Sequence, residues 1–364
     1  MNGLERGSIC LLHSIKGLGN RHLWKAKEFF GSFAECLQSD RGQLSRCFSS
    51  FEMVKEIISL REKYDPLDYL QSLSIQGINT LSIEEGKYPE MLRNIGNPPF
   101  LLYYKGDIEV SRQMCLAVVG SRKATLYGKN TARKIGNELG AKNIVVVSGM
   151  ARGIDTEAHR GALDAGAKTI AVLGSGLNIL YPRENARLFE EICLSGVVLS
   201  EFPLDVQPEP GNFPMRNRII SGLSRGVIVV EAQRKSGALI TADFALEQGR
   251  DVFAVPGPIN ASNSEGTNNL IKQGAKLTSC IEDILEEYYD IAKEDKEEKL
   301  SQQRLLLLDK NEGLIIQCIG YEPVHFDELL KNSGLGIGEI STVLLKLELE
   351  GILKSMPGNY YVKI

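Results

Sequence analysis

The chain has 364 residues, of which 43% are hydrophobic and 24% are charged, and its formal net charge at pH 7 is −4. This length and composition predict a folded globular protein with two or three domains. The seven cysteines are scattered and form no CxxC pair, so we expect no disulfide framework and a reducing, cytoplasmic setting. No stretch approaches the roughly 18 uninterrupted apolar residues of a membrane span, so we expect neither a secreted nor a membrane-embedded protein.

The acidic residues are unevenly distributed. Residues 111–285 carry 20 basic and 17 acidic side chains, whereas residues 286–300 carry 3 and 7, an excess equal to the net charge of the whole chain. The middle of the chain is therefore mildly basic, which is weak evidence for a nucleic-acid partner. Whether the chain binds nucleic acid has to be judged from where the basic residues lie.

Residues 1–80 predict a small helical domain of the SAM or helix-hairpin-helix type. Residues 7–75 lack strand alternation, and Ile15-Lys16-Gly17-Leu18-Gly19 precedes a helical pattern at 21–30. Two glycines around one apolar residue suit a helix-hairpin-helix turn whose amides meet a phosphate. An ordinary helix connection with glycine caps explains the same residues and is favoured, so no DNA contact is expected here.

Residues 81–285 predict a Rossmann-like core, an α/β fold with a doubly wound parallel sheet. After an extended stretch that ends near Tyr104, apolar strands alternate with helical patterns at intervals of roughly 25 to 30 residues, as βαβ units require. The predicted strands are 116–119, 144–147, 169–173, 197–200, 227–231 and 252–255. In such a sheet the strands end at a shared rim, where ligands bind.

The C-terminal part predicts a charged linker at 286–300 and a winged-helix domain at 301–364. Helical patterns at 305–319, 326–332 and 338–349 precede a hairpin with its turn at 357–359. The third helix would be the recognition helix, but its surroundings hold Glu339, Glu348 and Glu350 against Lys346. Because this acidity opposes insertion into a groove lined with phosphates, we expect a protein-contact or accessory module.

The loops after the first three strands combine small residues with bases. Helix N-termini and exposed amides at this rim favour phosphate, and an arginine adds a fixed positive charge. The resulting candidates for DNA binding are Gly120, Ser121, Arg122, Ser148, Gly149 and Arg152. The third loop, 174–176, has the same small residues, and Asp155 is expected to cap the helix that follows the second loop.

Two later segments extend this rim. Phe213-Pro214-Met215-Arg216-Asn217-Arg218 joins one aromatic ring to two arginines, a combination that can stack a base and neutralise the backbone. Lys235-Ser236-Gly237 opens a helix, where a phosphate is favoured. The candidates here are Phe213, Arg216, Asn217, Arg218, Lys235, Ser236, Gly237, Thr241 and Asn268, although a core position for Phe213 and caps for the polar residues explain the same pattern.

Conventional catalysis has little support in the sequence. His13, His22, His159 and His325 show no ligand spacing, so no metal site is expected. Loop 174–179 has Ile179 where a dinucleotide fingerprint needs a small residue, and no Walker lysine occurs, so no NAD, ATP or other cofactor is expected. Glu201 and Glu231 end strands on the rim and could act as acid or base, or could orient the arginines.

These residues resemble one family. Gly120-Ser121-Arg122, the run 148–155, Tyr181-Pro182-Arg183-Glu184-Asn185, the run 213–222, the run 236–242 and Gly266-Thr267-Asn268 are similar in order and kind to the motifs of the bacterial DNA-processing DprA (Smf) family. The similarity is dense over about 105–280 and looser at both ends.

The resemblance implies a non-enzymatic protein that binds single-stranded DNA, protects incoming DNA during natural transformation and loads the RecA recombinase. It further implies a homodimer through the Rossmann-like core and a basic DNA pocket. Carried over by motif, Arg122 and Arg183 belong to that pocket, together with the motif residues at 216–218 and 235–236.

Two rival hypotheses remain. A nucleotide hydrolase resembling the lysine-decarboxylase-like phosphoribohydrolases would use Glu201 or Glu231, but that family's Pro-Gly-Gly-x-Gly-Thr loop is replaced here by Pro256-Gly257-Pro258 and a later Gly266-Thr267. A winged-helix transcription factor would bind duplex DNA, which conflicts with the acidic recognition helix.

Overall fold

The computed structural model describes residues 1–288, 309–320, 322–349 and 352–363. They form two compact units, Met1–Ile284 and Leu285–Ile364, which are described separately. The predicted linker lies outside the described residues from residue 289 onward, as do residues 305–308 of a predicted helix. Among the described residues, no helix combines the length and the hydropathy that crossing a membrane requires.

Six helices open the first unit. They are α1 (Gly3–His13), α2 (Asn20–Phe30), α3 (Phe33–Gln38), α4 (Arg41–Cys47), α5 (Phe51–Lys63) and α6 (Pro66–Ile75). Side chains such as Ser32 and Asp40 accept hydrogen bonds from amides in the first turns of these helices, which explains where they begin. In the turn between α1 and α2, Gly17 has a φ of +85°, and Gly19 is the extended N-cap residue of α2.

A nine-stranded sheet forms the centre of the first unit. Its strands are β1 (Asn79–Ser82), β2 (Leu101–Gly106), β3 (Cys115–Val119), β4 (Val145–Ser148), β5 (Thr169–Val172), β6 (Val197–Ser200), β7 (Gly226–Val229), β8 (Asp251–Ala254) and β9 (Lys276–Leu277). Their order in space is β1-β2-β6-β5-β4-β3-β7-β8-β9. The pairs from β6 to β9 are parallel, whereas β1–β2 and β2–β6 are antiparallel. The parallel sheet that the sequence predicts is therefore confirmed, with an antiparallel extension at one edge.

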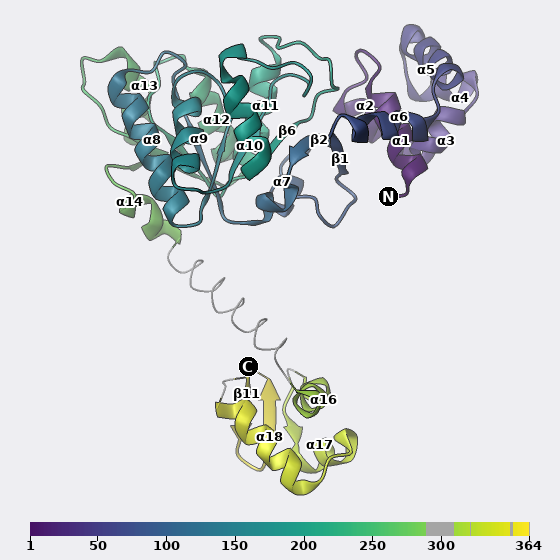
Figure 1. Cartoon of the computed structure of the whole chain (residues 1–364), viewed down its shortest axis with the longest axis vertical. Helices are drawn as coiled ribbons and strands as arrows, with labels where there is room; N and C mark the ends of the chain where they lie inside the picture. The colour runs from purple at the N-terminus through teal and green to yellow at the C-terminus, as the bar shows by residue number, and fades with distance from the viewer. Residues whose placement is uncertain (289–308, 321, 350–351, 364) are drawn as a thin grey trace. The chain divides into compact units, whose positions relative to one another are not determined.

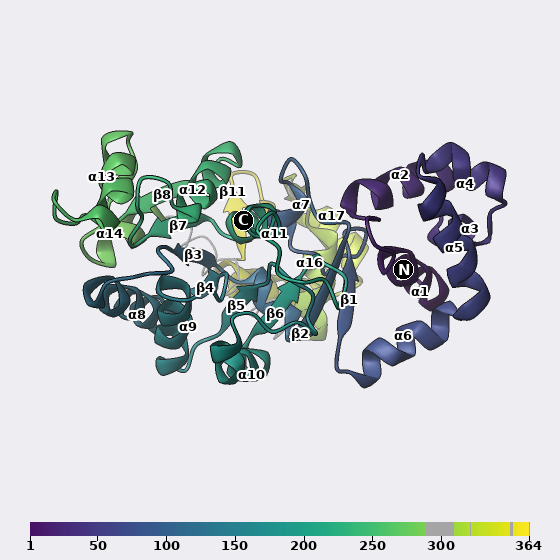
Figure 2. The same cartoon turned by 90° about the horizontal axis from the view of Figure 1, so that it is seen from above.

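Helices cover both faces of this sheet. Figure 2 shows α8 (Leu126–Ala141), α9 (Ile154–Asp164) and α10 (Ala186–Ser195) along one side, and α11 (Asn212–Gly222), α12 (Gly237–Glu247) and α13 (Glu265–Lys272) along the other. The remaining short elements are α7 (Glu90–Arg93), η1 (Ile108–Arg112), η2 (Arg183–Asn185), η3 (Ser262–Ser264), α14 (Glu282–Leu285) and η4 (Glu286–Tyr288). The chain runs outward from β3 in both directions, so the strand order reverses between β3 and β7. In doubly wound sheets this switch point is where ligands bind.

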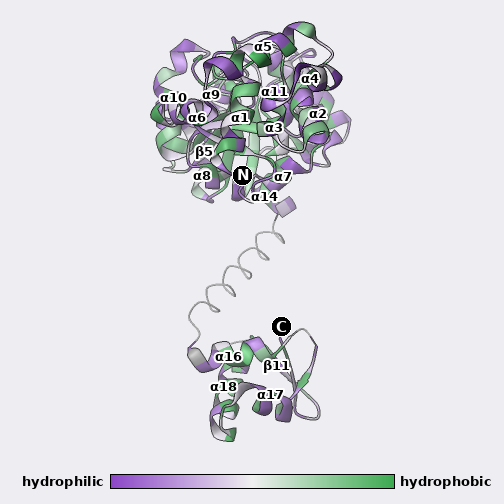
Figure 3. Ribbon diagram, turned by 90° about the vertical axis from the view of Figure 1, so that its right-hand side faces the viewer, coloured by the Kyte–Doolittle hydropathy of each residue, from purple (hydrophilic) through white to green (hydrophobic). Residues whose placement is uncertain are grey.

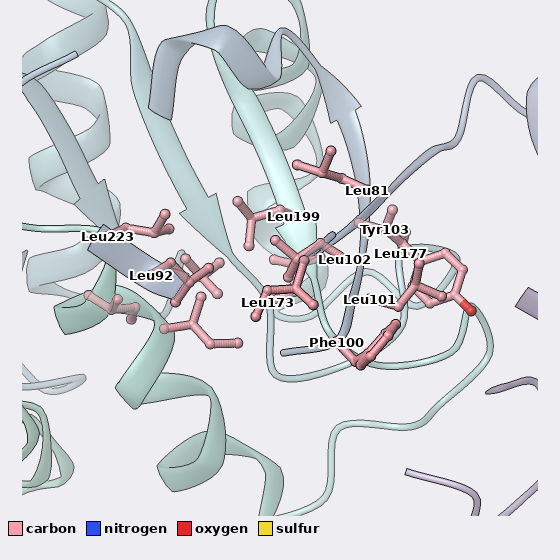
Figure 4. Close-up of a cluster of buried hydrophobic side chains, with 14 of the residues drawn as sticks. Leu81, Leu92, Phe100, Leu101, Leu102, Tyr103, Leu173, Leu177, Leu199 and Leu223 are labelled. Carbon is pink, nitrogen blue, oxygen red and sulfur yellow. The ribbon is translucent and has the colours of Figure 1, made fainter. Parts of the chain in front are cut away.

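The antiparallel edge joins the N-terminal helices to the sheet (Figure 1). Arg6 of α1 donates to the carbonyl oxygen of Thr80 on β1 (3.0 Å), and the Phe100 amide donates to Asn20 of α2 (2.7 Å). Figure 4 shows Leu81, Leu102, Tyr103, Leu199 and Leu173 in one buried cluster that spans this edge and the parallel strands. The hydrophobic core is continuous across this boundary.

The second unit is a winged helix, as the sequence predicts. Its elements are α16 (Lys310–Cys318), β10 (Val324–His325), α17 (Phe326–Ser333), α18 (Ile337–Leu349), β11 (Leu353–Met356) and β12 (Tyr360–Lys363), and its sheet has the order β10-β12-β11. Ile315, Leu329, Ile340, Leu344 and Leu347 form its core. The alternating green and purple of these helices in Figure 3 reflects that one-sided burial. The short strand β10 was not predicted.

Candidate nucleic-acid interface

A cavity of about 590 Å³ lies at the switch point of the sheet. Its walls come from the segments that follow β3, β4, β5, β6 and β7, including the first turns of α11 and α12. Its lining includes Gly120, Ser121, Arg122, Lys123, Ala151, Asp155, Tyr181, Pro208, Pro210, Phe213, Arg216, Asn217, Gln233, Ser236, Gly237 and Thr241. The structure therefore brings loops from five parts of the chain to one rim, as the sequence predicts.

Glu231, which lies two residues after the end of β7, fixes the loop after β3 through hydrogen bonds. The Ser121 amide donates to the Glu231 carbonyl oxygen (2.8 Å), and the Glu231 carboxylate accepts from the Thr125 amide (2.9 Å) and the Thr125 hydroxyl. A Cβ at Gly120 would lie 2.9 Å from that carbonyl oxygen and 2.6 Å from Ile154. Glu231 is 3% exposed. It orients the backbone of this loop, and no arginine in the described residues pairs with its carboxylate.

Arg122 and Phe213 form a stacked pair at the cavity. The Arg122 guanidinium carbon lies 4.5 Å from the centre of the Phe213 ring, and the centre of the Tyr181 ring lies 5.7 Å from the centre of the Phe213 ring. Phe213 is half-buried and Arg122 is exposed. Within the described part of the chain Arg122 has no carboxylate partner, so its charge is available to a ligand.

Arg216 forms the floor of the cavity. Its side chain is 3% exposed and donates to the carbonyl oxygens of Gly149 (2.7 Å) and Val172. Burial lowers the Arg216 pKa to about 10, with Asp155 opposing that shift and Arg122 adding to it. A Cβ at Gly149 would lie 2.4 Å from the guanidinium, so a side chain at this position would displace Arg216. Arg216 therefore sets the position of the loop after β4.

Asp155 has a different role from the predicted helix cap. Helix α9 has Gly153 as its N-cap residue, and Asp155 lies in the first turn, where its carboxylate accepts from the Gly149 amide (3.1 Å). Burial raises the Asp155 pKa, and the charge of Arg216 and the Ala151 and Gly149 amides oppose that shift. Asp155 thus fixes the loop after β4 from its own helix.

The N-terminus of α12 faces the same cavity. Ser236 is its N-cap residue and accepts from the Ala238 amide, while Asn217 of α11 donates to the Gly237 carbonyl oxygen (3.1 Å). Thr241 is 1% exposed and lines the same cavity. An anion in the cavity would meet a helix N-terminus and hydroxyl groups here.

A second cavity of about 180 Å³ adjoins the first. It shares Arg122, Lys123, Ala151, Tyr181 and Phe213 with the larger cavity and adds Gly149, Arg152, Gly174, Ser175 and Pro182. A Cβ at Gly174 would lie 2.8 Å from Cδ1 of Phe213, so the glycine leaves room for the ring. The Tyr181-Pro182 peptide bond is cis. Phe213 and Arg122 lie between the two cavities.

Three of the predicted residues lie away from both cavities. Ser148 is fully buried and donates to the Val118 carbonyl oxygen (2.6 Å), which links two strands. Arg218 is 5% exposed and makes two bonds to Glu201, at 3.0 and 2.5 Å. Asn268 clasps the Gly257 peptide through both of its side-chain ends. Most of their polar atoms bond to protein groups, although Arg218 Nε has no partner in the described residues, so the structure gives these three side chains roles in the fold rather than at the cavities.

Two further predicted bases, Arg183 and Lys235, are exposed but line neither cavity. Neither forms an ion pair within the described ranges.

One residue that the sequence did not single out, Asn263, also contributes to the site. Asn263 donates to the Lys123 carbonyl oxygen (2.9 Å) and accepts from the Gln233 side chain (3.0 Å), so it connects the loops after β3 and β7. No sequence signal identifies it, because its partners lie 30 and 140 residues away.

The structure also bears on the remaining candidates for chemistry. The part of the chain that the structure describes holds no cluster of three or more His, Cys, Asp or Glu side chains able to bind a metal ion. His159 is fully buried, and burial, followed by the charge of Arg216, lowers its pKa to about 3. Its ring contacts Thr169 (2.7 Å) inside the fold.

Comparisons with known proteins agree with this architecture. The profile of the family "DNA recombination-mediator protein A" matches residues 79–289, and that of the "DprA winged helix domain" matches residues 300–359. Protein Smf of Escherichia coli is 43% identical over 280 residues, which cover 75% of this chain and 74% of that protein. DNA processing protein DprA of Streptococcus pneumoniae is 41% identical over 274 residues, covering 75% and 94%.

Two solved structures resemble this one. The crystal structure of DprA from S. pneumoniae has a TM-score of 0.66 and 40% identity, covering 77% of this chain and 96% of that chain. A structure of DNA processing protein A from Helicobacter pylori, described for its single-stranded DNA binding mode, has a TM-score of 0.54 and 32% identity, covering 58% and 96%. With its Rossmann-like core, its rim of glycine and arginine loops and its winged helix, the chain belongs to the DprA/Smf family of DNA recombination mediators.

Proposed function

We propose that this protein binds single-stranded DNA in the two adjoining cavities and acts as a recombination mediator that protects incoming DNA and loads RecA during natural transformation. The observation that carries the proposal is the Arg122–Phe213 pair between the cavities, with Lys123 beside it. An aromatic face can stack a base of any kind, and unpaired cations can neutralise successive phosphates. The structure of the H. pylori protein, described for its single-stranded DNA binding mode, supports the same ligand.

Two features support a binding role over catalysis. Glu201 is held by Arg218, and Glu231 is held by Thr125, so the acidic residues at the rim already bond to protein groups. A general acid or base would need such an oxygen within reach of a substrate proton. A check for base released from nucleoside monophosphates tests the hydrolase alternative, and turnover abolished by Glu201→Gln would contradict our proposal.

Salt dependence tests the DNA-binding part. A fluorescently labelled thymidine oligonucleotide is titrated at rising salt, and log affinity is expected to fall with a slope of roughly −0.7 for each neutralised phosphate. Arg122→Ala should weaken binding roughly ten-fold or more, because a hydrogen bond to a charged group contributes about 1.5–3 kcal/mol.

Arg112→Ala is the matched control for that variant. Arg112 ends η1, three residues before β3 begins, and is exposed beside Glu109, whereas Arg122 follows the carboxyl end of the same strand. Its loss should leave the affinity unchanged. Salt-independent binding, or equal affinity for a folded Arg122→Ala variant and the wild type, would contradict the proposed site.

The mediator role needs a separate experiment. RecA, single-stranded DNA and single-strand-binding protein are mixed with or without this protein, and filament formation is followed by RecA's ATP hydrolysis. Faster filament formation supports loading, and an unchanged rate argues against it.

We also propose a homodimer through the Rossmann-like core and an accessory, protein-contacting role for the winged helix, whose Lys346 pairs with Glu312. Sedimentation of the full chain tests the dimer.

A further inference from the structure

Arg152 differs from the other bases that line the cavities. Arg122 and Lys123 are exposed and have no carboxylate partner within the described residues, and Arg216 is buried against carbonyl oxygens. The Arg152 guanidinium instead contacts Glu184 in two places, Nε to Oε1 and Nη2 to Oε2, the latter at 3.0 Å. The two side chains are 58% and 53% exposed. Among the exposed bases that line the cavities, Arg152 is therefore paired with a carboxylate, whereas in the described part of the chain Arg122 and Lys123 are not.

The position of Glu184 is set by the residue that follows it. The buried Asn185 side chain donates to the Met150 carbonyl oxygen and to the Thr156 hydroxyl, both at 2.9 Å. These bonds attach the segment 181–185 to the loop that carries Arg152. The same segment contributes Tyr181 and Pro182 to the wall of the smaller cavity. The Glu184 carboxylate is thus placed at the edge of the cavity that Arg152 lines.

A carboxylate in this arrangement has the geometry of a phosphate ligand. The guanidinium can donate two parallel hydrogen bonds to the two oxygens of a carboxylate, and it can donate the same pair to two oxygens of a phosphate. The hydrogen bonds from Arg152 lower the pKa of the Glu184 carboxyl, so Glu184 is charged at neutral pH. A free carboxylate beside a polyanion is repelled, whereas an exposed ion pair is weak and opens at little cost.

We propose that Glu184 occupies Arg152 in the free protein in place of a DNA phosphate, and that the strand displaces it on entering the smaller cavity. This inference rests on the proposed function, since it assigns Arg152 as a DNA contact and Glu184 as its internal competitor. Glu184 thereby limits the affinity of the site for DNA and keeps Arg152 oriented when no strand is bound.

The test is the salt-dependent titration of the labelled thymidine oligonucleotide with Glu184→Gln. Removing the competitor should raise affinity about two- to five-fold, the effect expected of one exposed ion pair. The slope of log affinity against log salt should become steeper, because no displaced Glu184 carboxylate then takes up a cation to offset the counterions that the DNA phosphates release. Glu190→Gln on α10 removes the same charge from a residue that has no cavity arginine as partner, and should change neither quantity.

A double variant separates competition from a structural role. In an Arg152→Ala background, Glu184→Gln should no longer raise affinity or steepen the slope, because the competitor has nothing to release. If the ion pair instead holds the two loops together, Glu184→Gln lowers affinity. That result, or an equal gain with and without Arg152, would overturn the inference. Salt-dependent binding by the wild type with an unchanged Glu184→Gln variant sinks this inference alone, whereas no binding by the wild type sinks the proposed function as well.

Discussion

Arg216 and Arg218 lie two residues apart on α11, and both are buried, but they belong to different regions of the molecule. Arg216 forms the floor of the larger cavity and fixes the loop after β4. Arg218 lies outside both cavity linings and pairs with Glu201, the residue that follows β6. The comparison shows that one basic motif can serve a binding site on one side of a helix and the stability of the fold on the other.

Removing one partner of the Arg218–Glu201 pair should have the largest effect of our predictions. Arg218→Ala leaves an uncompensated carboxylate that is 6% exposed, which is expected to cost about 3–5 kcal/mol of unfolding free energy. Burial raises the Glu201 pKa, and Arg218 opposes that shift, so the variant should also favour the protonated carboxyl. Urea denaturation measures the loss.

The double variant Arg218→Ala with Glu201→Ala sharpens the comparison. It should lose less stability than the sum of the two single variants, because neither charge is then left unpaired. DNA affinity, measured where each variant is still folded, should stay close to that of the wild type. A large affinity loss in a stable double variant would place Arg218 with the cavity after all.

Acid should destabilise the fold through His159, which is buried on α9. The Thr169 hydroxyl donates to the Val146 carbonyl oxygen, so it accepts from His159 Nδ1–H, and His159 Nε2 is left without a partner in the described residues. Burial lowers the His159 pKa from 6.5 to about 3. The folded protein therefore binds fewer protons than the unfolded chain below pH 6.5, and stability is lost as the pH falls from 6.5 toward 3.

Between pH 7 and 5 this linkage should remove on the order of 2 kcal/mol for His159. His13, whose pKa burial lowers to about 4, should contribute similarly from the N-terminal helices. Urea midpoints at the two pH values measure the sum. His159→Asn keeps a donor to Thr169 but does not titrate, so it should reduce the acid sensitivity, and an unchanged pH dependence would exclude His159 as its source.

A smaller effect, confined to DNA binding, is expected from Gly174→Ala. The added Cβ would lie 2.8 Å from the Phe213 ring and should displace it from Arg122, weakening DNA binding by roughly ten-fold, within the 1–3 kcal/mol of one stacked base. Gly211→Ala, just before α11, meets nothing within 4 Å and is the control. Equal affinities for the two variants would show that the position of the ring does not matter.

The parallel strands, the glycine loops and the winged helix could be predicted because they depend on local patterns. The strands β3–β8 are nearly continuous apolar runs, and each is followed by residues that break a strand. By contrast β1 follows no such pattern, since it is a short edge strand with polar residues that becomes recognisable through its pairing with β2.

The division of labour within the site could not be predicted. Arg216 and Arg218 have the same chemistry and nearly the same place in the sequence, and it is the packing of α11 that turns one toward the cavity and the other toward Glu201. Ser148 was expected at the rim because its loop follows a strand, and Asn268 because its segment opens a helix there. Their hydrogen bonds, to Val118 on the neighbouring strand and to Gly257 in the loop after β8, depend on the folded arrangement, which a local pattern does not encode.

The bonds from Glu231 and Asn263 to the loop after β3 have a kinetic consequence. They exist before any strand arrives, so the cavity pays little ordering entropy on binding. Association should then be governed by diffusion and charge steering, and differences between variants of the cavity should appear mainly in how long the strand stays bound. For such a site we expect a fast association rate, and we expect the affinity to be set mainly by the dissociation rate of the strand.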